Sequence, residues 1–158
     1  MLKEMFGMAE GILQDLHNDH QEVAKLIDNI MESEDGGQRA TLFKEMMTKL
    51  LAHSKAEAAV LYAPMKKSDD EEVRSFALEG ENEHTHVETQ LKMMSAQRDK
   101  VGEKWTAELT VLKELVEHHV GEEEDTGFKC ARAEFDKAEL EKMGKRFETL
   151  KKKEMAAA

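Results

Sequence analysis

The pattern that decides the fold is carried by residues 43–62, FKEMMTKLLAHSKAEAAVLY. Apolar residues recur in it every three or four positions, which predicts a helix with one apolar face. His53 and Glu57 lie on that same face, because residues four apart share one side of a helix. A face turned towards the core is normally apolar, since an unpaired buried charge is costly. The two polar residues therefore indicate a polar site inside a helical protein.

Four other segments show the same helical periodicity, and glycine or charged turns separate them. The expected helices run over about residues 12–34 and 39–64, from Ser68 to the break at Gly102, from there to about Gly127, and onward from Asp136. Ser68 and Asp136 each have a Glu three residues later, which is the spacing of a capping box. The chain therefore reads as five helices in sequence.

Short loops between long amphipathic helices make consecutive helices antiparallel neighbours. The predicted fold is all-α, an up-down-up-down four-helix bundle with a shorter fifth C-terminal helix. A single Pro and many helix-forming residues agree with this class. The 158 residues are enough for one domain with its own core. We expect an N-terminal extension over residues 1–11, the bundle domain over 12–152 and a C-terminal tail over 153–158.

Composition limits the partners of the protein. A net charge of −11 argues against nucleic-acid binding, because affinity for phosphates comes from clustered Lys and Arg. No apolar run approaches the roughly 20 residues that cross a bilayer, so no membrane partner is expected. Cys130 is the single cysteine and cannot form an internal disulfide. With no secretory pattern at the N-terminus, this indicates a reducing, cytoplasmic location.

The second half of the chain repeats the polar residues of the first half in the same order. Two pairs of segments match, namely Asp19-His20-x-x-Val23 with Glu83-His84-x-x-Val87, and His53-x-x-x-Glu57 followed by Tyr62 with His119-x-x-x-Glu123 followed by Phe128. A His followed by a Glu four residues later also occurs at His84/Glu88 and at His118/Glu122. That spacing alone is weak evidence, and the ordered repeat is what makes it informative.

The repeated residues are predicted to lie at one height in the bundle. His20 precedes the loop residue Asp35 by 15 residues, and His53 follows Gly37 by 16. At about 1.5 Å per residue, the two heights differ by only about 2 Å. The same comparison about Gly102 brings the other two helices into register. One layer therefore collects His20, His53, Glu57, His84, His119 and Glu123.

Four imidazoles and two carboxylates in one layer form a donor set that suits iron, manganese or zinc. Without a Cys cluster, structural zinc is not the first choice. Because a carboxylate can bridge, the layer predicts two metal ions with two His each, both Glu side chains shared, and a bridging oxide or hydroxide. Such a pair leaves a position open for dioxygen, peroxide or nitric oxide. His17, on the edge of its stripe, is an alternative extra ligand, and Tyr62 and Trp105 are interpreted as core packing.

Taken together, these four motifs resemble the hemerythrin-like (HHE cation-binding) family over about residues 12–152. The resemblance implies a four-helix bundle with a non-haem di-iron centre bridged by two carboxylates, and it assigns the ligands to the same six residues. It also implies roles in oxygen, nitric oxide, peroxide or iron handling and in stress responses. A ferritin-like site is disfavoured, because it needs a Glu-x-x-His pair on each of two helices and both such pairs here fall on one.

One position departs from the family pattern. Oxygen-carrying hemerythrins have a further His one turn before the ligand that corresponds to His84, and here that position is Gly80. We expect the glycine to open one iron or to leave space for His17 or Glu81, which argues against reversible oxygen carriage. The hypotheses are an oxidoreductase that consumes peroxide or nitric oxide, an iron store or iron/oxygen sensor without turnover, and a purely structural bundle. The redox partner is not specified by the sequence.

Overall fold

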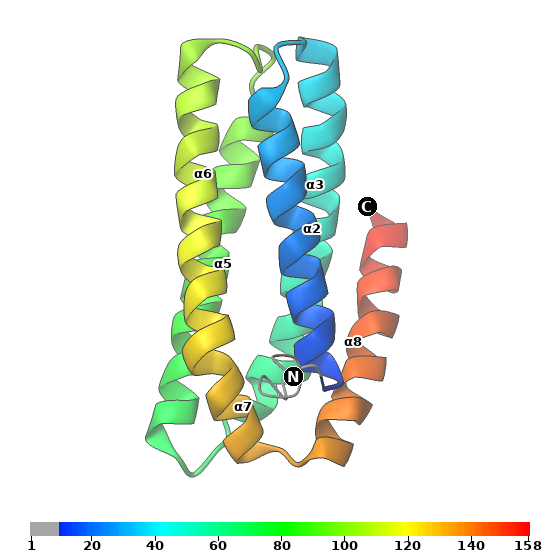
Figure 1. Cartoon of the computed structure of the whole chain (residues 1–158), viewed down its shortest axis with the longest axis vertical. Helices are drawn as coiled ribbons and strands as arrows, with labels where there is room; N and C mark the ends of the chain where they lie inside the picture. The colour runs from blue at the N-terminus through cyan, green and yellow to red at the C-terminus, as the bar shows by residue number, and fades with distance from the viewer. Residues whose placement is uncertain (1–9) are drawn as a thin grey trace, which may run out of the picture.

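The computed structural model describes residues 10–158, and all the regular structure in that range is helical (Figure 1). The elements in chain order are α2 (Ile12–Glu32), α3 (Gly36–Glu57), η1 (Ala58–Tyr62), α4 (Ala63–Met65), α5 (Glu71–Ser95), α6 (Glu103–Glu122), η2 (Glu123–Gly127), α7 (Phe128–Glu134) and α8 (Lys137–Ala157). The all-α prediction is confirmed. Most of the expected N-terminal extension, residues 1–9, lies outside the described residues.

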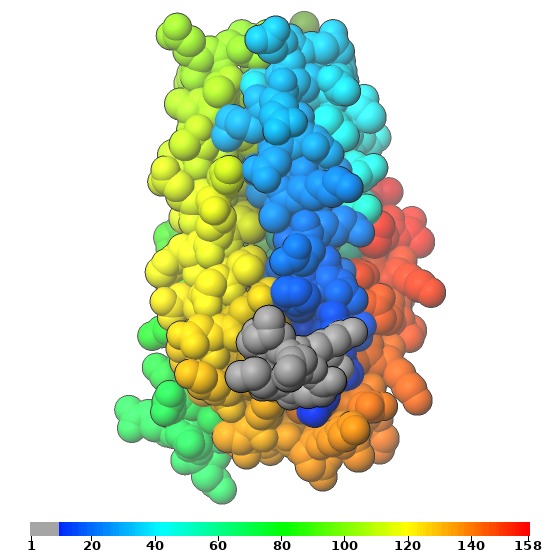
Figure 2. Space-filling view, viewed as in Figure 1, coloured from blue at the N-terminus to red at the C-terminus, as the bar shows by residue number. Residues whose placement is uncertain are grey.

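Four long helices, α2, α3, α5 and α6, run alternately up and down and form the bundle, as predicted (Figure 1). The fifth helix, α8, lies against α2 and α3 on one side of it. It has 21 residues, the same number as α2, and is shorter than α3 and α5. Its length is therefore comparable to that of the bundle helices. Figure 2 shows the side chains of α2 lying against those of α6 on one side and of α3 on the other. Among residues 10–158, no helix is both long and apolar enough to cross a membrane.

Side-chain caps set several helix starts. The predicted capping box at Asp136 and Glu139 is confirmed, with the Asp136 carboxylate accepting from the Glu139 N–H at 2.8 Å. The predicted cap at Ser68 is wrong, because Asp70 caps α5 and accepts from the N–H of Glu72. A carboxylate is favoured there by the positive end of the helix dipole. The Ser68 hydroxyl instead donates to Glu134 at 2.6 Å, which joins the loop before α5 to α7.

The second helix starts at Gly36, earlier than the expected residue 39. The Asp35 side chain accepts from the Gln38 N–H at 2.8 Å, and this cap stabilises a first turn of two glycines. Close by, the buried Arg39 guanidinium donates to the carbonyls of Ser33 and Lys100 at 2.7 and 2.8 Å. It thereby joins the two loops at the same end of the bundle.

A polar layer divides the core into two apolar clusters. The first contains Leu16, Val60 and Phe147, and the second contains Ile27, Leu91 and Trp105. Burying each large apolar side chain stabilises the fold by about 1.5–3 kcal/mol. The two clusters therefore hold the four helices in register above and below the polar layer, where the candidate site lies.

Candidate metal centre

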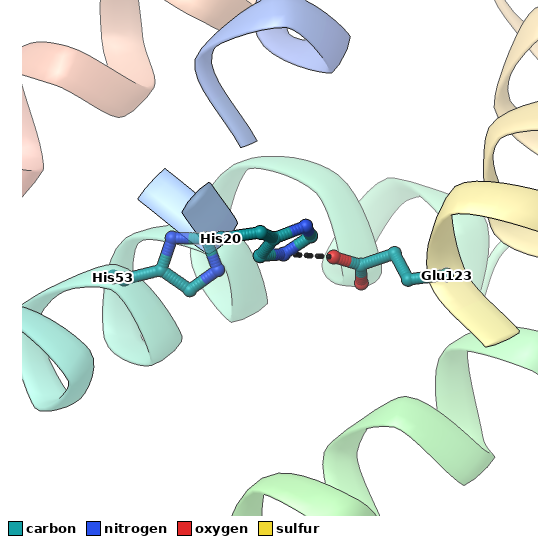
Figure 3. Close-up of side chains that lie close together, drawn as sticks. All are labelled: His20, His53 and Glu123. Carbon is teal, nitrogen blue, oxygen red and sulfur yellow. Dashed lines mark ion pairs between the residues drawn. The ribbon is translucent and has the colours of Figure 1, made fainter. Parts of the chain in front are cut away.

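The structure brings all six predicted residues together in two groups of three. Within each group, the ligand atoms all lie within 4.8 Å of one another. The first group contains His20, His53 and Glu123, and the second contains Glu57, His84 and His119. The first group, drawn in Figure 3, joins α2, α3 and the start of η2. That these residues bind metal stays a prediction, but the layer inferred from residue spacing is present.

Each glutamate lies between imidazoles of both groups. Glu57 Oε1 is 3.5 Å from His53 Nε2 and 3.1 Å from His84 Nε2. On the other side, Glu123 Oε1 is 3.2 Å from His20 Nε2, and its Oε2 is 3.7 Å from His119 Nε2. The two carboxylates therefore occupy the place that bridging ligands between two metal ions would take.

Several atoms of the centre are buried without a hydrogen-bond partner. They are His20 Nε2, His53 Nε2, both carboxylate oxygens of Glu57, and Glu123 Oε1. Nearly all buried polar atoms in folded proteins are hydrogen-bonded, and leaving one unsatisfied costs about 1–3 kcal/mol. Five such nitrogen and oxygen atoms close together are what a cation site requires, because each can coordinate a cation once any imidazolium proton has left. The residues present therefore fit one or two metal cations.

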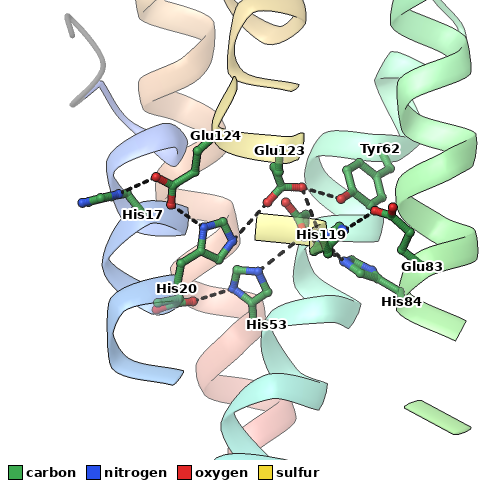
Figure 4. Close-up of polar contacts among 11 residues, drawn as sticks. His17, His20, His53, Tyr62, Glu83, His84, His119, Glu123 and Glu124 are labelled. Carbon is green, nitrogen blue, oxygen red and sulfur yellow. Dashed lines mark hydrogen bonds and ion pairs between the residues drawn. The ribbon is translucent and has the colours of Figure 1, made fainter. Parts of the chain in front are cut away.

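Outer carboxylates hold three of the four imidazoles by their far nitrogen (Figure 4). The contacts to Nδ1 are 2.7 Å from Glu124 to His20, 2.8 Å from Asp19 to His53, and 2.7 Å from Glu83 to His119. An acceptor on Nδ1 keeps the proton on that nitrogen and leaves Nε2 free to face the centre. The rings are thus fixed in the orientation that metal ligands need.

Two of these carboxylates, Asp19 and Glu83, directly precede predicted ligands in the sequence, but the sequence analysis did not assign them a role. Asp19 directly precedes His20 but holds His53 on the neighbouring helix, and Glu83 directly precedes His84 but holds His119. The repeated acidic-His pairs therefore encode contacts between helices. Glu124 adds a further contact, because its second oxygen lies 2.9 Å from Nδ1 of His17.

Tyr62 fills the space over Gly80, so the expectation that His17 or Glu81 enters this space is wrong. That the glycine opens a position on one iron stays a prediction. A Cβ on Gly80 would lie 2.6 Å from the Tyr62 hydroxyl. The two alternative groups are engaged elsewhere, His17 with Glu124 and Glu81 with Lys66. Tyr62 is fully buried, as a core residue would be, but its hydroxyl also donates to Glu123 Oε2. The phenol therefore belongs to the polar layer.

Each His–Glu pair that the sequence repeats is accompanied by a turn of π-helix, which begins at the Glu or directly after it. The segment η1 begins directly after Glu57, and η2 begins at Glu123. Such turns are rare and often occur at functional sites, because the added residue changes the direction of nearby side chains. The first of them ends at Tyr62, which points its hydroxyl across the layer to Glu123. The repeat seen in the sequence is therefore also a repeat in the backbone.

The carboxylates and imidazoles of the centre shift one another's pKa. Burial opposes ionisation of Glu57, but its contacts with His53 and His84 outweigh burial and hold the pKa of that carboxyl well below its usual range. Burial lowers the pKa of His53, but the neighbouring carboxylates of Asp19 and Glu57 outweigh burial and raise that pKa to about 10. For His20, burial likewise opposes the effect of the neighbouring Glu123 and Glu124 carboxylates, which raise the pKa to about 9. Burial and the charges of Glu123 and Glu57 raise the pKa of Tyr62, so the phenol keeps its proton. A bound cation would take the place of the imidazolium protons.

A small cavity adjoins the centre on the side away from Tyr62. Its volume is about 20 Å³, and it is lined by the four ligand imidazoles, by Asp19 and Ser54, and by the apolar residues Val23, Leu50, Val87, Val116 and Val120. A volume of this size holds about one water molecule. The cavity therefore admits a molecule about the size of water beside the four imidazoles.

Fold and site together define a helical bundle with a buried imidazole–carboxylate cation site. Residues 11–131 match the family model described as the hemerythrin HHE cation-binding domain, and they span most of the chain. The protein belongs to this family. The match contains all six centre residues and ends before α8. Searches of curated proteins and of solved structures gave no match.

Proposed function

We propose that this protein is a non-haem di-iron protein that binds or reduces a small oxidant, namely dioxygen, hydrogen peroxide or nitric oxide. The observation that carries the proposal is the pair of ligand groups with two carboxylates between them and five buried, unpartnered polar atoms. The four imidazoles of these groups also line a cavity of about 20 Å³. Family membership supports cation binding at this place. The paired arrangement supports two ions.

His20 and His53 would hold one ion, and His84 and His119 the other, with Glu57 and Glu123 shared between them. Iron at these positions would supply electrons and Lewis acidity to an oxidant. Manganese and zinc suit the same donors, but zinc has no redox chemistry. The donor set alone therefore supports a divalent metal, and the choice of iron rests on the family.

The protein's own residues restrict what reaches the centre. Valine and leucine side chains line the cavity and exclude bulk water, so charged or large molecules are disfavoured. Tyr62 holds a proton on its hydroxyl and donates it in a hydrogen bond to Glu123, which fixes that carboxylate in its shared position. The small volume and the valine and leucine side chains of the lining together favour diatomic molecules and peroxide over organic substrates.

Metal content and turnover test the proposal. Apo-protein loaded with Fe(II) without oxygen should retain two iron ions per chain and should then consume peroxide or nitric oxide faster than the same amount of free iron. Glu123→Ala should lower the iron content, and Glu122→Ala, at an exposed neighbouring position, should not. Retention of fewer than two ions refutes the di-iron site. Two retained ions without binding or turnover of any of the three oxidants would instead identify an iron store.

A further inference from the structure

The fifth helix, α8, lies outside the family match but contacts the centre. It packs along α2 and α3, and Lys55 on α3 pairs with Glu154 on α8 at 3.4 Å. The ring of Phe147 is fully buried and meets the His53 ring edge-on, with centroids 5.5 Å apart and planes at 84°. An element beyond the residues that match the family model therefore touches a candidate ligand directly.

A series of charged contacts extends from the same helix to the same ligand. Lys151 Nζ donates to Asp19 Oδ1 at 2.7 Å, and Asp19 Oδ2 is 2.8 Å from His53 Nδ1. The side chains of Lys151 and Asp19 are only 17% and 16% exposed, so solvent screens this ion pair weakly. The ammonium group holds the Asp19 carboxylate in the position from which it accepts the His53 proton.

The other two outer carboxylates have different second partners. The second oxygen of Glu124 faces His17, and the second oxygen of Glu83 faces His118 at 3.2 Å. The side chains of these two histidines are 43% and 66% exposed. Asp19 is instead fixed by a largely buried lysine. The support of His53 is therefore more rigid and more positive than the support of His20 or His119.

We infer that Lys151 is a positioning residue for the metal position formed by His20, His53 and Glu123, and that α8 thereby makes the two positions of the centre unequal. The inference rests on the proposed function, because it requires two metal positions. Without the ammonium group, the Asp19 carboxylate can turn towards water, and His53 loses the acceptor that orients it. Loss of such an outer partner lowers metal affinity about 10–100-fold in other proteins.

A purely electrostatic role for Lys151 would give the opposite result. A positive charge near two cation positions repels both ions, so its removal would tighten binding at both. Positioning acts through His53 alone and weakens one position. The direction of the change and the number of positions affected therefore separate the two roles.

Titration with Co(II) tests the inference, because the visible bands of the ion report its coordination and need no turnover. The metal-free full-length protein is titrated as wild type, Lys151→Met, Lys151→Arg and Lys152→Met. Lys152 is the exposed neighbour on the same helix, so its variant changes net charge equally without touching Asp19. We expect two Co(II) per wild-type chain, about tenfold weaker binding at one position in Lys151→Met, and near wild-type binding in the other two variants.

The unaffected second position in Lys151→Met also shows that the variant is folded. If that variant fails to fold, Lys151→Gln replaces it in the same titration. Equal affinities in Lys151→Met and Lys152→Met, weakening of both positions, or tighter binding would each overturn the inference. A wild-type protein that binds fewer than two Co(II) would refute the proposed two-metal function itself, so the two failures are distinguishable.

Discussion

Replacing Gly80 by alanine tests the packing that separates this centre from a centre with one more histidine. The added Cβ would lie 2.6 Å from both the hydroxyl and Cζ of Tyr62, and 2.9 Å from Cε2. Side chains do not approach so closely, so the ring must move. Tyr62 is fully buried and its ring packs edge-on against Phe76, which leaves little room for the movement. Any shift also lengthens the hydrogen bond to Glu123.

The expected size of the effect follows from three contributions. Alanine favours a helix interior over glycine by about 1 kcal/mol. Overpacking a core costs about 1–3 kcal/mol, and loss of the donor to a buried carboxylate oxygen costs about 1–3 kcal/mol. Gly80→Ala should therefore lower the free energy of unfolding by about 1–5 kcal/mol. For a chain of this length, that corresponds to a fall in Tm of about 2–20 °C.

Thermal and urea unfolding of the metal-free protein measure this change. Gly121→Ala is the matched control, because Gly121 lies within α6 and a Cβ there has no neighbour within 4 Å. The control should be stabilised by up to about 1 kcal/mol. In a Tyr62→Leu background, Gly80→Ala should lose most of its cost, because the clashing atoms are absent. If Gly80→Ala is as stable as Gly121→Ala in the wild-type background, Tyr62 does not occupy this space.

Three further changes have defined outcomes. Burial, reinforced by the charge of Glu148, raises the pKa of Asp15 from 3.8 to about 6. The folded state therefore binds the Asp15 proton more tightly than the unfolded state does. The protonated carboxyl contributes to stability below about pH 4, and this contribution is lost as the pH rises through 6. Asp15→Asn should therefore raise Tm at pH 7.5 and change it little at pH 3.5, and an equal rise at both pH values would contradict this. Arg39→Met leaves the loop carbonyls without their buried donor and should cost about 2–4 kcal/mol in urea unfolding, with a loss below 1 kcal/mol counting against the role described for it. Tyr62→Phe should lower the Tm of the metal-free protein more than that of the metal-loaded protein, since a cation compensates the Glu123 carboxylate, and equal losses would show that no cation binds beside it.

The features that the sequence predicts correctly depend on residues close together in the chain. Helical periodicity placed His53 and Glu57 on one face, and counting residues from the loops placed them level with His20, because each residue adds a fixed rise along a helix. The cap at Asp136 was predictable for the same reason, since it joins residues three apart. The cap at Ser68 failed, because a nearby carboxylate competed for the helix end and Ser68 found a partner on a distant helix.

The interpretation of Gly80 failed for a different reason. The sequence shows which side chain is missing, but it does not show which neighbour enters the space. Tyr62 was taken as core packing, and its burial agrees with that reading. The π-helical turn before it directs the hydroxyl to Glu123, and the repeat of His and Glu spacing did not predict that turn.

The sequence by itself therefore determined the helices, their order and the six residues of the layer, because helical geometry is nearly constant and converts residue number into height and face. Only the tertiary structure decided which groups surround that layer. Asp19 holds His53 and not its neighbour His20, and Lys151 reaches Asp19 from a helix more than a hundred residues away. Such contacts depend on the rotation and separation of packed helices. Those quantities are set by side-chain packing over the whole bundle, so no periodicity within one segment specifies them.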